Sequence, residues 1–541
     1  MRKIVDLMTQ ETLTSKSSRE LYWREPVITA FLRYANVLAI IQQFSDGELW
    51  FLNYCIQLQI NRGSYTGMNL DFCVGDMLNT VYRCPFLSIE VLDIEEFIGD
   101  GNERDLIEKV IHYIDQGKYV YLPVDWFYIP AYQMYEEQHD AHDILVFGYD
   151  QENRELSVAD FFENFKYQRA NCSYKEFFAA FKNVLRLPCI LDKVLLMKPC
   201  CRDIIFDLGI VRELLRDYIG AKNSNRRFLP VYRCLDFLND DLFEFGVDVY
   251  EKLTGYLHYI AEAKILVQIR SYDILYEHKL ALLRLSIYMR DYGYLRNDSD
   301  IIAKLEGIKK QCLLIRNILL KYNITMKVEL VERCVRLLED VREKETEALQ
   351  QWLESMNEEP CLPKPEGQIV TSDARYVGED RSTMGNWNGA YGDAGFDIFE
   401  EREIGERIRI VYHGFIPKKW KEISTYDDPV YVRTRDGKSS FAECKFFEKK
   451  ACMDIMLLED KPYMLSFYIL AWWEFNRDFS IQILDSDSGR ELCEKRVIAS
   501  SEGLYVNFIV SGHVKIIFVN HSTDLGVLSG VFFSAVCDEE A

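Results

Sequence analysis

A histidine and an aspartate lie at corresponding ends of two neighbouring apolar runs. His142 precedes the run Ile144 to Tyr149, a polar break covers Asp150 to Arg154, and Asp160 lies in the second run, Leu156 to Phe162. Two short apolar runs with a turn-rich break between them predict a β-hairpin. In such a hairpin the carboxylate can hold one tautomer of the imidazole for a nearby nucleophile. The alternative is that both are solvated loop residues, because a short motif is only a hypothesis about structural context.

The order of these residues resembles the C39-peptidase-like branch of the papain fold, in which a histidine precedes one strand and an aspartate lies on the next. Here the first strand ends Gly148-Tyr149-Asp150. Within that branch the chain is similar to the butirosin biosynthesis protein H family, whose papain-like domain is followed by a helical segment. A second similarity, to that helical part, covers Phe245 to Leu253 and Ile269 to Lys279. The resemblance spans roughly residues 15 to 300 and implies acyl transfer from a carrier-protein thioester by a Cys-His-Asp arrangement, in peptide or aminoglycoside-type natural-product biosynthesis.

The cysteine that this resemblance implies is absent from its expected place. It should open the first long helix, for which residues 23–34 are the best candidate, but no cysteine occurs before Cys55. The position is held instead by Trp23 or Arg24, and neither side chain can attack a carbonyl carbon. We expect a helix begun at Glu25 to keep its structural role while covalent chemistry is lost. We predict that Trp23, Arg24 and Glu25 contact the substrate where the family presents its sulfur.

A displaced cysteine is the alternative. Cys55 and Cys73 are close enough in sequence to approach the site. Cys55, however, lies in Trp50 to Ile56, which predicts a buried strand, and buried cysteines are usually inert. An active cysteine acyltransferase or hydrolase therefore stays open as a second interpretation.

The composition is that of a folded, acidic protein. Hydrophobic residues make up 48% of the 541 residues and aromatic residues 13%, which excludes a mainly disordered chain. The length predicts about two to four domains. The formal net charge is -22, from 86 acidic and 64 basic residues, and no long basic block offsets it. We therefore expect neither nonspecific nucleic-acid binding nor attraction to anionic lipid.

The N-terminus and the cysteines favour a cytoplasmic protein. No sustained apolar core follows the first basic residues, and no apolar run approaches the roughly 20 residues that a transmembrane helix needs. The 15 cysteines are odd in number and scattered, so we expect reduced thiols. No CxxC occurs, and we predict neither a metal nor a cofactor. The oligomeric state stays open.

Shifts in pattern along the chain predict a multidomain α+β protein. Residues 1–197 mix helix-like and strand-like segments, which predicts a C39-peptidase-like (papain-like) α+β domain. Within it we expect a helix near Arg104 to Gln116, a strand at Tyr119 to Val124 and a capped amphipathic helix after Ser173. Residues 198–356 carry apolar stripes at helical spacing, one of them through Leu305, Ile308 and Cys312, and predict a helical domain. Residues 357–367 contain three prolines and a glycine among charged residues and predict a linker. Residues 368–541 are rich in strand-like runs and predict an antiparallel, jelly-roll-like β-sandwich.

This last region resembles an accessory β-sandwich module found appended to bacterial hydrolases, through the glycine- and aromatic-rich residues 380–392. Carbohydrate binding is a third interpretation, in which exposed Trp472 or Trp473 would stack on sugar rings. Aromatic residues in strands are more often part of a core. Asp485 and Asp487 alone are weak evidence for calcium.

The resemblance therefore leads us to expect an accessory protein of natural-product biosynthesis that binds a carrier protein or a peptidyl or acyl ligand, as a non-covalent or non-catalytic relative of acyltransferases. Its catalytic status is left open. Without a nucleophile, His142 and Asp160 could still act as a general base on a bound acceptor amine. No phosphate-binding loop, Gly-x-Ser-x-Gly elbow or His-Glu-x-x-His occurs, so nucleotide hydrolases, serine hydrolases and zincins are unsupported.

Overall fold

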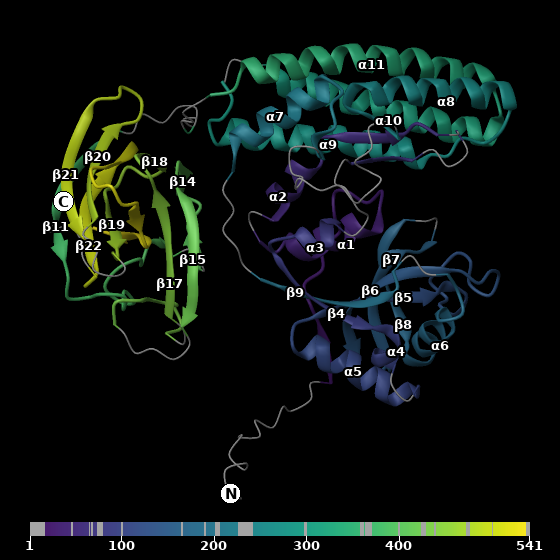
Figure 1. Cartoon of the computed structure of the whole chain (residues 1–541), viewed down its shortest axis with the longest axis horizontal. Helices are drawn as coiled ribbons and strands as arrows, with labels where there is room; N and C mark the ends of the chain where they lie inside the picture. The colour runs from purple at the N-terminus through teal and green to yellow at the C-terminus, as the bar shows by residue number, and fades with distance from the viewer. Residues whose placement is uncertain are drawn as a thin grey trace, which may run out of the picture. The chain divides into compact units, whose positions relative to one another are not determined.

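The computed structural model (Figure 1) describes residues 17–44, 47–63, 65, 69–72, 79–98, 101–163, 166–188, 191–200, 206–225, 242–296, 300–357, 362, 371–398, 401–423, 429–437, 440–471, 477–499 and 501–536. The chain divides into two compact units. The first comprises Met1–Glu48 and Asp76–Cys200, and the second comprises Leu49–Gly75 and Cys201–Ala541. Both combine helices with antiparallel sheets, and the C-terminal region is rich in strands, which confirms the predicted multidomain α+β class.

Within the described residues, the first unit is built on a 7-stranded sheet in the order β4-β9-β5-β6-β7-β8, with β1 paired to β6. Its strands are β1 (Ser18–Glu20), β4 (Leu87–Asp93), β5 (Tyr119–Asp125), β6 (Ala141–Asp150), β7 (Glu155–Phe161), β8 (Tyr167–Ser173) and β9 (Lys193–Pro199). Its helices are α1 (Leu32–Ile41), α3 (Asn79–Arg83), α4 (Ile94–Ile98), α5 (Glu103–Asp115) and α6 (Tyr174–Val184), and a 3-10 turn, η1 (Trp126–Tyr128), follows β5.

Helices cover both faces of this sheet (Figure 1). On one face α5 and α6 contribute Leu106 and Phe181 to a core that includes Val146 of β6. On the other face lies α1, where the hydroxyl of Tyr167 on β8 donates to Asn36 Oδ1 at 2.8 Å. Because successive side chains of a strand point to opposite faces, each residue of β5 to β8 is committed to one of these two layers.

The helices on the first face begin where their sequences indicate. The Asn102 side chain accepts from the backbone N–H of Asp105 at the start of α5. At α6, the Ser173 side chain accepts from the backbone N–H of Glu176, and the Glu176 side chain accepts from that of Ser173. This capping box confirms the capped amphipathic helix predicted there.

The predicted helix from Glu25 is wrong in its start, because α1 begins at Leu32. Phe31 has extended backbone angles (φ -131, ψ 138) and precedes the first helical residue. Pro26 disfavours a helical conformation for the residue before it. Upstream, the backbone N–H of Leu21 donates to the carbonyl of Phe147 at 2.8 Å, which ties the chain to β6 in an extended form. Tertiary hydrogen bonds therefore override the local helical pattern.

The buried strand predicted at Trp50 to Ile56 is also wrong. Residues Gly47–Tyr54 form helix α2, and only Leu58–Asn61 form a strand, β2. The buried residues Leu49, Leu52 and Cys55 recur every third position, a spacing that suits a helix better than a strand. In the second unit β2 pairs with β3 (Leu70–Phe72) and with β10 (Phe243–Phe245).

The predicted helical segment is present in the second unit. It comprises α7 (Leu208–Ile219), the turn η5 (Gly246–Asp248), α8 (Val249–Ala263), α9 (Arg270–Asp291), α10 (Ile301–Thr325) and α11 (Val328–Glu354). The stripe predicted through Leu305, Ile308 and Cys312 is buried. Among the described residues, no helix combines the length and the apolar character needed to cross a membrane.

The C-terminal β region forms antiparallel sheets around an aromatic core that includes Phe447, Phe479 and Phe518. One sheet has the order β11-β22-β19-β25-β12-β13, another β14-β18-β23-β20-β21, and a third β15-β17-β16 with β24 beside β17. The strands are β11 (Asp373–Asp380), β12 (Gly395–Asp397), β13 (Arg402–Ile404), β14 (Ile408–His413), β15 (Ile416–Ile423), β16 (Val432–Arg433), β17 (Ser440–Phe447), β18 (Lys450–Leu457), β19 (Tyr463–Ile469), β20 (Arg477–Asp485), β21 (Glu491–Ala499), β22 (Leu504–Ser511), β23 (His513–Asn520), β24 (Gly526–Leu528) and β25 (Gly530–Ala535).

The sequence of this region raised two possibilities, calcium binding at Asp485 and sugar stacking by two tryptophans. Asp485 Oδ1 accepts hydrogen bonds from the backbone N–H and the hydroxyl of Ser488, both at 2.7 Å, so this carboxylate closes a turn. Trp472 and Trp473 lie outside the described residues. The division into domains at residues 198–356 and 368–541 stays a prediction.

A buried ionic cluster holds the helical segment of the second unit together. Lys279 Nζ of α9 lies 2.5 Å from Glu345 Oε1 of α11, and both side chains are fully buried. Tyr218 and Tyr250 donate to Glu345 Oε2 at 3.0 and 2.6 Å. Burial, together with the Lys279 charge, lowers the pKa of His278 well below its usual value. The neutral ring accepts from Lys279 at Nδ1 (2.7 Å) and donates from Nε2 to a backbone carbonyl, that of Ile56 (2.9 Å).

Removing one charge of this cluster should destabilise the protein strongly. We expect Lys279→Met to lower the free energy of unfolding by about 3–5 kcal/mol, because it leaves the buried carboxylate without its cation. Lys279→Met with Glu345→Gln removes both charges, keeps an acceptor for the two tyrosines, and should cost less than Lys279→Met alone. Urea denaturation of the full chain measures both effects.

The matched control is Lys344→Met, which breaks the exposed pair of Lys344 with Asp340 on α11. This variant should leave the urea midpoint of unfolding nearly unchanged, because exposed ion pairs contribute little to the free energy of unfolding. A Lys279→Met midpoint equal to that of this control would show that the buried cluster does not stabilise the fold.

Candidate functional site

The hairpin of β6 and β7 brings the two predicted chemical residues to one face of the sheet. Its register pairs Leu145 with Ala159 and Val146 with Val158. Asp160 therefore shares a face with Val158, and His142 shares that face with Val146, since side chains alternate along each strand. This is the face that α5 and α6 cover. Diagonal neighbours on one face of a sheet are close enough for long side chains to touch.

His142 and Asp160 form a hydrogen-bonded pair. His142 Nδ1 lies 2.7 Å from Asp160 Oδ2, and the Asp160 side chain is fully buried. A carboxylate can only accept, so the proton of this hydrogen bond belongs to Nδ1. The Nε2 atom of the neutral ring is then an acceptor, which is the tautomer that a general base needs.

Two further donors hold the Asp160 carboxylate. The backbone N–H of Phe161 donates to Oδ1 at 2.6 Å, and the Tyr132 hydroxyl donates to Oδ2. Burial, and after it the Asp160 charge, raises the pKa of Tyr132 well above its usual value, so the phenol keeps its proton. With both oxygens engaged, the carboxylate cannot rotate away from His142 without leaving buried groups unpaired.

Aromatic rings position the imidazole. Trp126 of η1 stacks on His142 with ring centroids 5.6 Å apart and planes 17° apart, and Tyr132 meets the ring edge-on at 6.0 Å. The His142 side chain nevertheless keeps 29% of its surface exposed. The imidazole is thus fixed in orientation and still reachable from solvent.

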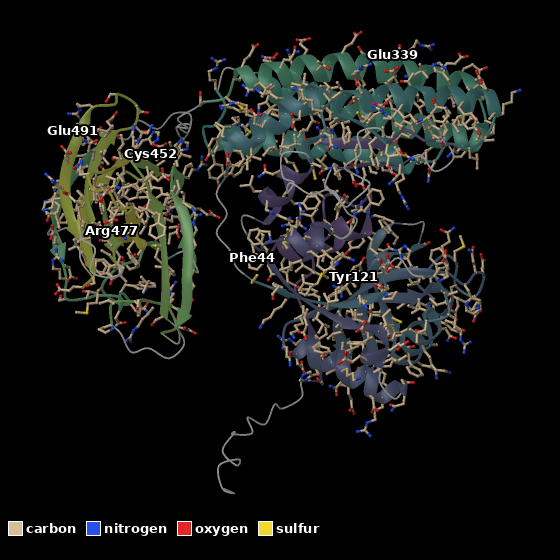
Figure 2. All side chains as sticks on the ribbon, viewed as in Figure 1. Phe44, Tyr121, Glu339, Cys452, Arg477 and Glu491 are labelled. Carbon is tan, nitrogen blue, oxygen red and sulfur yellow. The ribbon has the colours of Figure 1, made fainter. Side chains whose placement is uncertain are left out.

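Asp143 faces the opposite side of the sheet, toward the α1 layer. The Tyr121 hydroxyl, whose residue is labelled in Figure 2, donates to Asp143 Oδ2 at 3.1 Å. Burial raises the pKa of Asp143 to about 6, although the neighbouring His142 charge and this hydrogen bond act in the other direction. Burial also raises the pKa of Tyr121, and the charge of Arg33 on α1 opposes that rise.

Of the three residues predicted to bind substrate, Trp23 is packed against the sheet, whereas Arg24 and Glu25 are exposed. Trp23 stacks on Tyr167 with ring centroids 6.2 Å apart, and Tyr167 pairs with Phe161, one residue beyond Asp160. Trp23 therefore packs on the face opposite to Asp160. Substrate contacts of these three residues stay a prediction. Helix α1, which begins at Leu32 and not at Glu25, lies on that opposite face.

Burial argues against Cys55, and against two cysteines of the first unit, as the missing nucleophile. Cys55 is fully buried, and burial, with the charges of Glu277 and Asp71, raises its pKa well above its usual value. In the first unit, burial raises the pKa of Cys84 to about 12 and also raises that of Cys172. A nucleophilic cysteine needs the opposite shift. Cys73 lies outside the described residues.

Sequence reasoning missed Tyr132, Trp126 and a second histidine–aspartate pair. Trp126 directly follows a predicted strand, but nothing in the sequence indicated that it would stack on a histidine. Tyr132 lies in an irregular connection, where no periodicity links it to a residue 28 positions away. The second pair joins His139 Nδ1 to Asp125 Oδ2 at 2.7 Å. Within the described residues, no group of three or more His, Cys, Asp or Glu side chains could hold a metal ion.

Comparison with known proteins gives one family match and two weak structural likenesses. Residues 96–161 match the family model described as butirosin biosynthesis protein H, N-terminal, and this stretch includes both members of the His142 pair. No curated protein matches the chain.

The chain is similar to a family 35 carbohydrate binding module from Clostridium thermocellum, with 11% identity, a TM-score of 0.16, and coverage of 24% of this chain and 99% of that one. It is also similar to TmCBM61 in complex with beta-1,4-galactotriose, with 9% identity, a TM-score of 0.13, and coverage of 24% and 90%. Likenesses of this size support no conclusion about fold or ligand. The firm finding is the partial match to butirosin biosynthesis protein H, which associates the first unit with a biosynthesis-related family.

Proposed function

We propose that this protein binds an acyl or peptidyl carrier protein in peptide or aminoglycoside-type natural-product biosynthesis and transfers the acyl group to an amine without a covalent intermediate. The observation that carries this proposal is the Asp160-held imidazole of His142, which lies inside the stretch that matches butirosin biosynthesis protein H. The family resemblance suggests the thioester substrate. The absence of a cysteine at residues 22 to 26 argues against an acyl-enzyme there.

In the proposed reaction the lone pair of the acceptor amine attacks the thioester carbonyl carbon. His142 Nε2 takes the proton that the nitrogen must lose, and Asp160 stabilises the imidazolium that results. The carbon–sulfur bond breaks, sulfur keeps the bonding electrons, and a proton completes the carrier thiol. Tyr132 acts through Asp160 and is a positioning residue.

A binding-only role is the main competitor, because the His142 pair could serve the fold alone. Its geometry favours chemistry in one respect. The His142 side chain keeps 29% of its surface exposed while Asp160 holds its Nδ1 atom. Carbohydrate binding through the C-terminal β region stays a prediction, since Trp472 and Trp473 lie outside the described residues.

Loss of the base should abolish turnover without weakening carrier binding. With acyl-loaded carrier protein and an amine acceptor, we expect His142→Ala to lower kcat by about 10²–10⁴-fold, the range typical of a general base. The Kd for the carrier should stay within about threefold, because the imidazole acts on the transition state. Chromatography of the amide product measures the rate.

A matched control is His112→Ala. His112 is an exposed histidine of α5 in the same unit, and its Nε2 atom lies 2.7 Å from the side-chain amide nitrogen of Gln116. This variant should keep the wild-type rate. Equal losses for both variants would indicate a structural effect, and tight carrier binding without product in the wild type would establish the binding-only role.

No acyl adduct should accumulate during turnover. We expect intact-mass measurement of the reacting protein to show only the unmodified chain, because Cys55 is a buried thiol and residues 22–26 offer no thiolate. Peptide mapping after a chemical quench locates any adduct. An acyl group found on Cys55 or Cys73 would restore the covalent mechanism with a displaced cysteine.

A further inference from the structure

Five large apolar side chains are exposed where the helices of the second unit turn. Ile324 is 83% exposed and Leu266 is 60% exposed. The others are Ile265, Leu320 and Met326, which are 41%, 39% and 39% exposed. Leu320 and Ile324 are four residues apart on α10 and therefore share a face of that helix. We call these five residues the apolar tip. Single exposed apolar residues are ordinary, whereas a group of them with a polar rim marks an interaction site.

Hydrogen bonds join the two connections that carry the apolar tip. One connection links α8 to α9, and the other links α10 to α11. Asn323 Oδ1 accepts from the backbone N–H of Val267 at 2.8 Å, and Asn323 Nδ2 donates to the carbonyl of Val267 at 2.9 Å. The Tyr322 hydroxyl donates to the carbonyl of Ile265 at 3.0 Å. The five side chains therefore belong to one surface, although the two connections are far apart in the sequence.

Each connection begins with a residue in the left-handed backbone conformation. Lys264 ends α8 with φ 52 and ψ 48, and Met326 ends α10 with φ 53 and ψ 27. Glycine adopts this conformation most easily, and it is the usual residue at such a helix end. The chain instead has a lysine and a methionine there. It thus places a charge and an apolar side chain at the tip at a local conformational cost.

Charges of both signs surround the apolar tip. The exposed lysines are Lys264, Lys321 and Lys327, and the exposed acids are Glu262 and Glu329. Within the part of the chain that the structure describes, none of these five side chains forms an ion pair. Each acid is two positions from a lysine, Glu262 from Lys264 and Glu329 from Lys327. The rim is therefore mixed in sign and does not form a purely basic or a purely acidic patch.

The mixed rim favours one class of occupant. The two glutamates would repel an acidic protein or an anionic lipid surface, and the three lysines would repel a basic partner. A two-fold contact between two copies of the chain places the same patch on both sides. The acids of one copy can then meet the lysines of the other, while burial of the apolar side chains supplies the driving force.

We propose that the apolar tip is a self-association surface through which two copies of this chain form a two-fold symmetric dimer. This inference goes beyond the function proposed above and does not depend on it. An interface centred on few side chains is small, so the dimer should be reversible, with a Kd of about 10–100 µM. The net charge of -22 opposes the approach of two copies. At about 0.15 M salt the screening length is about 8 Å, so charges close to the contact dominate.

Sedimentation equilibrium of the full chain, at about 1–200 µM to bracket the expected Kd, measures this association. The wild type should change from monomer to dimer across the range. Ile324→Glu should raise the Kd by at least about tenfold, because it places an unpaired charge in the apolar contact. The matched control is Ile498→Glu, which changes an isoleucine of β21 that is 59% exposed. This control should keep the wild-type Kd.

The charges of the rim give a second test. Lys321→Glu combined with Lys327→Glu makes the rim mainly acidic, and Glu262→Lys combined with Glu329→Lys makes it basic. Each double variant should associate more weakly than the wild type when it is alone, because like charges then meet. A mixture of the two double variants should form a mixed dimer, because opposite rims meet again.

Three outcomes would overturn the proposal. The first is a wild-type chain that stays monomeric over the whole concentration range. The second is an equal rise in Kd for Ile324→Glu and Ile498→Glu, which would show that the apolar tip has no special role. The third is a monomeric wild type that cosediments with phosphatidylglycerol vesicles and loses this binding in Ile324→Glu. That result would assign the apolar tip to a lipid surface.

Discussion

The geometry of the candidate site depends on the burial of one carboxylate. Asp160 is fully removed from solvent, and a buried carboxylate has to be hydrogen-bonded to be tolerated. Its donors come from its own strand, from β6, and from the connection after β5: Phe161, His142 and Tyr132. Satisfying Asp160 therefore fixes the hairpin, the η1 connection and the imidazole together. The same hydrogen bond that satisfies the carboxylate also engages Nδ1 of a ring that keeps part of its surface exposed.

The second unit also contains a buried carboxylate that several donors hold. Glu345 is fully buried and accepts from Lys279, Tyr218 and Tyr250. Through His278 the cluster reaches the carbonyl of Ile56, more than 200 positions away in the chain. This hydrogen bond and the pairing of β2 with β10 tie residues of the 49–75 segment to the second unit, although the segment interrupts the first unit in sequence.

Much of the first unit was predictable from local patterns. The apolar runs on either side of Asp150 to Arg154 form β6 and β7, the helix expected near Arg104 to Gln116 is α5, and the strand expected at Tyr119 to Val124 is β5. Two predictions failed where tertiary contacts decide. The chain before Leu32 is held extended by hydrogen bonds to β6 and α1, and the residues around Cys55 satisfy both a strand-like and a helix-like pattern.

By itself the sequence determined the α+β class, the hairpin that carries His142 and Asp160, and the lack of a cysteine before Cys55, because each depends on residue types and short-range spacing. Only the tertiary structure decided that Tyr132 completes the site, that Trp23 packs on the opposite face, and that His139 and Asp125 form a second pair. These contacts join residues of irregular connections to distant strands. No periodicity encodes them, and the need to satisfy buried polar groups selects them during folding.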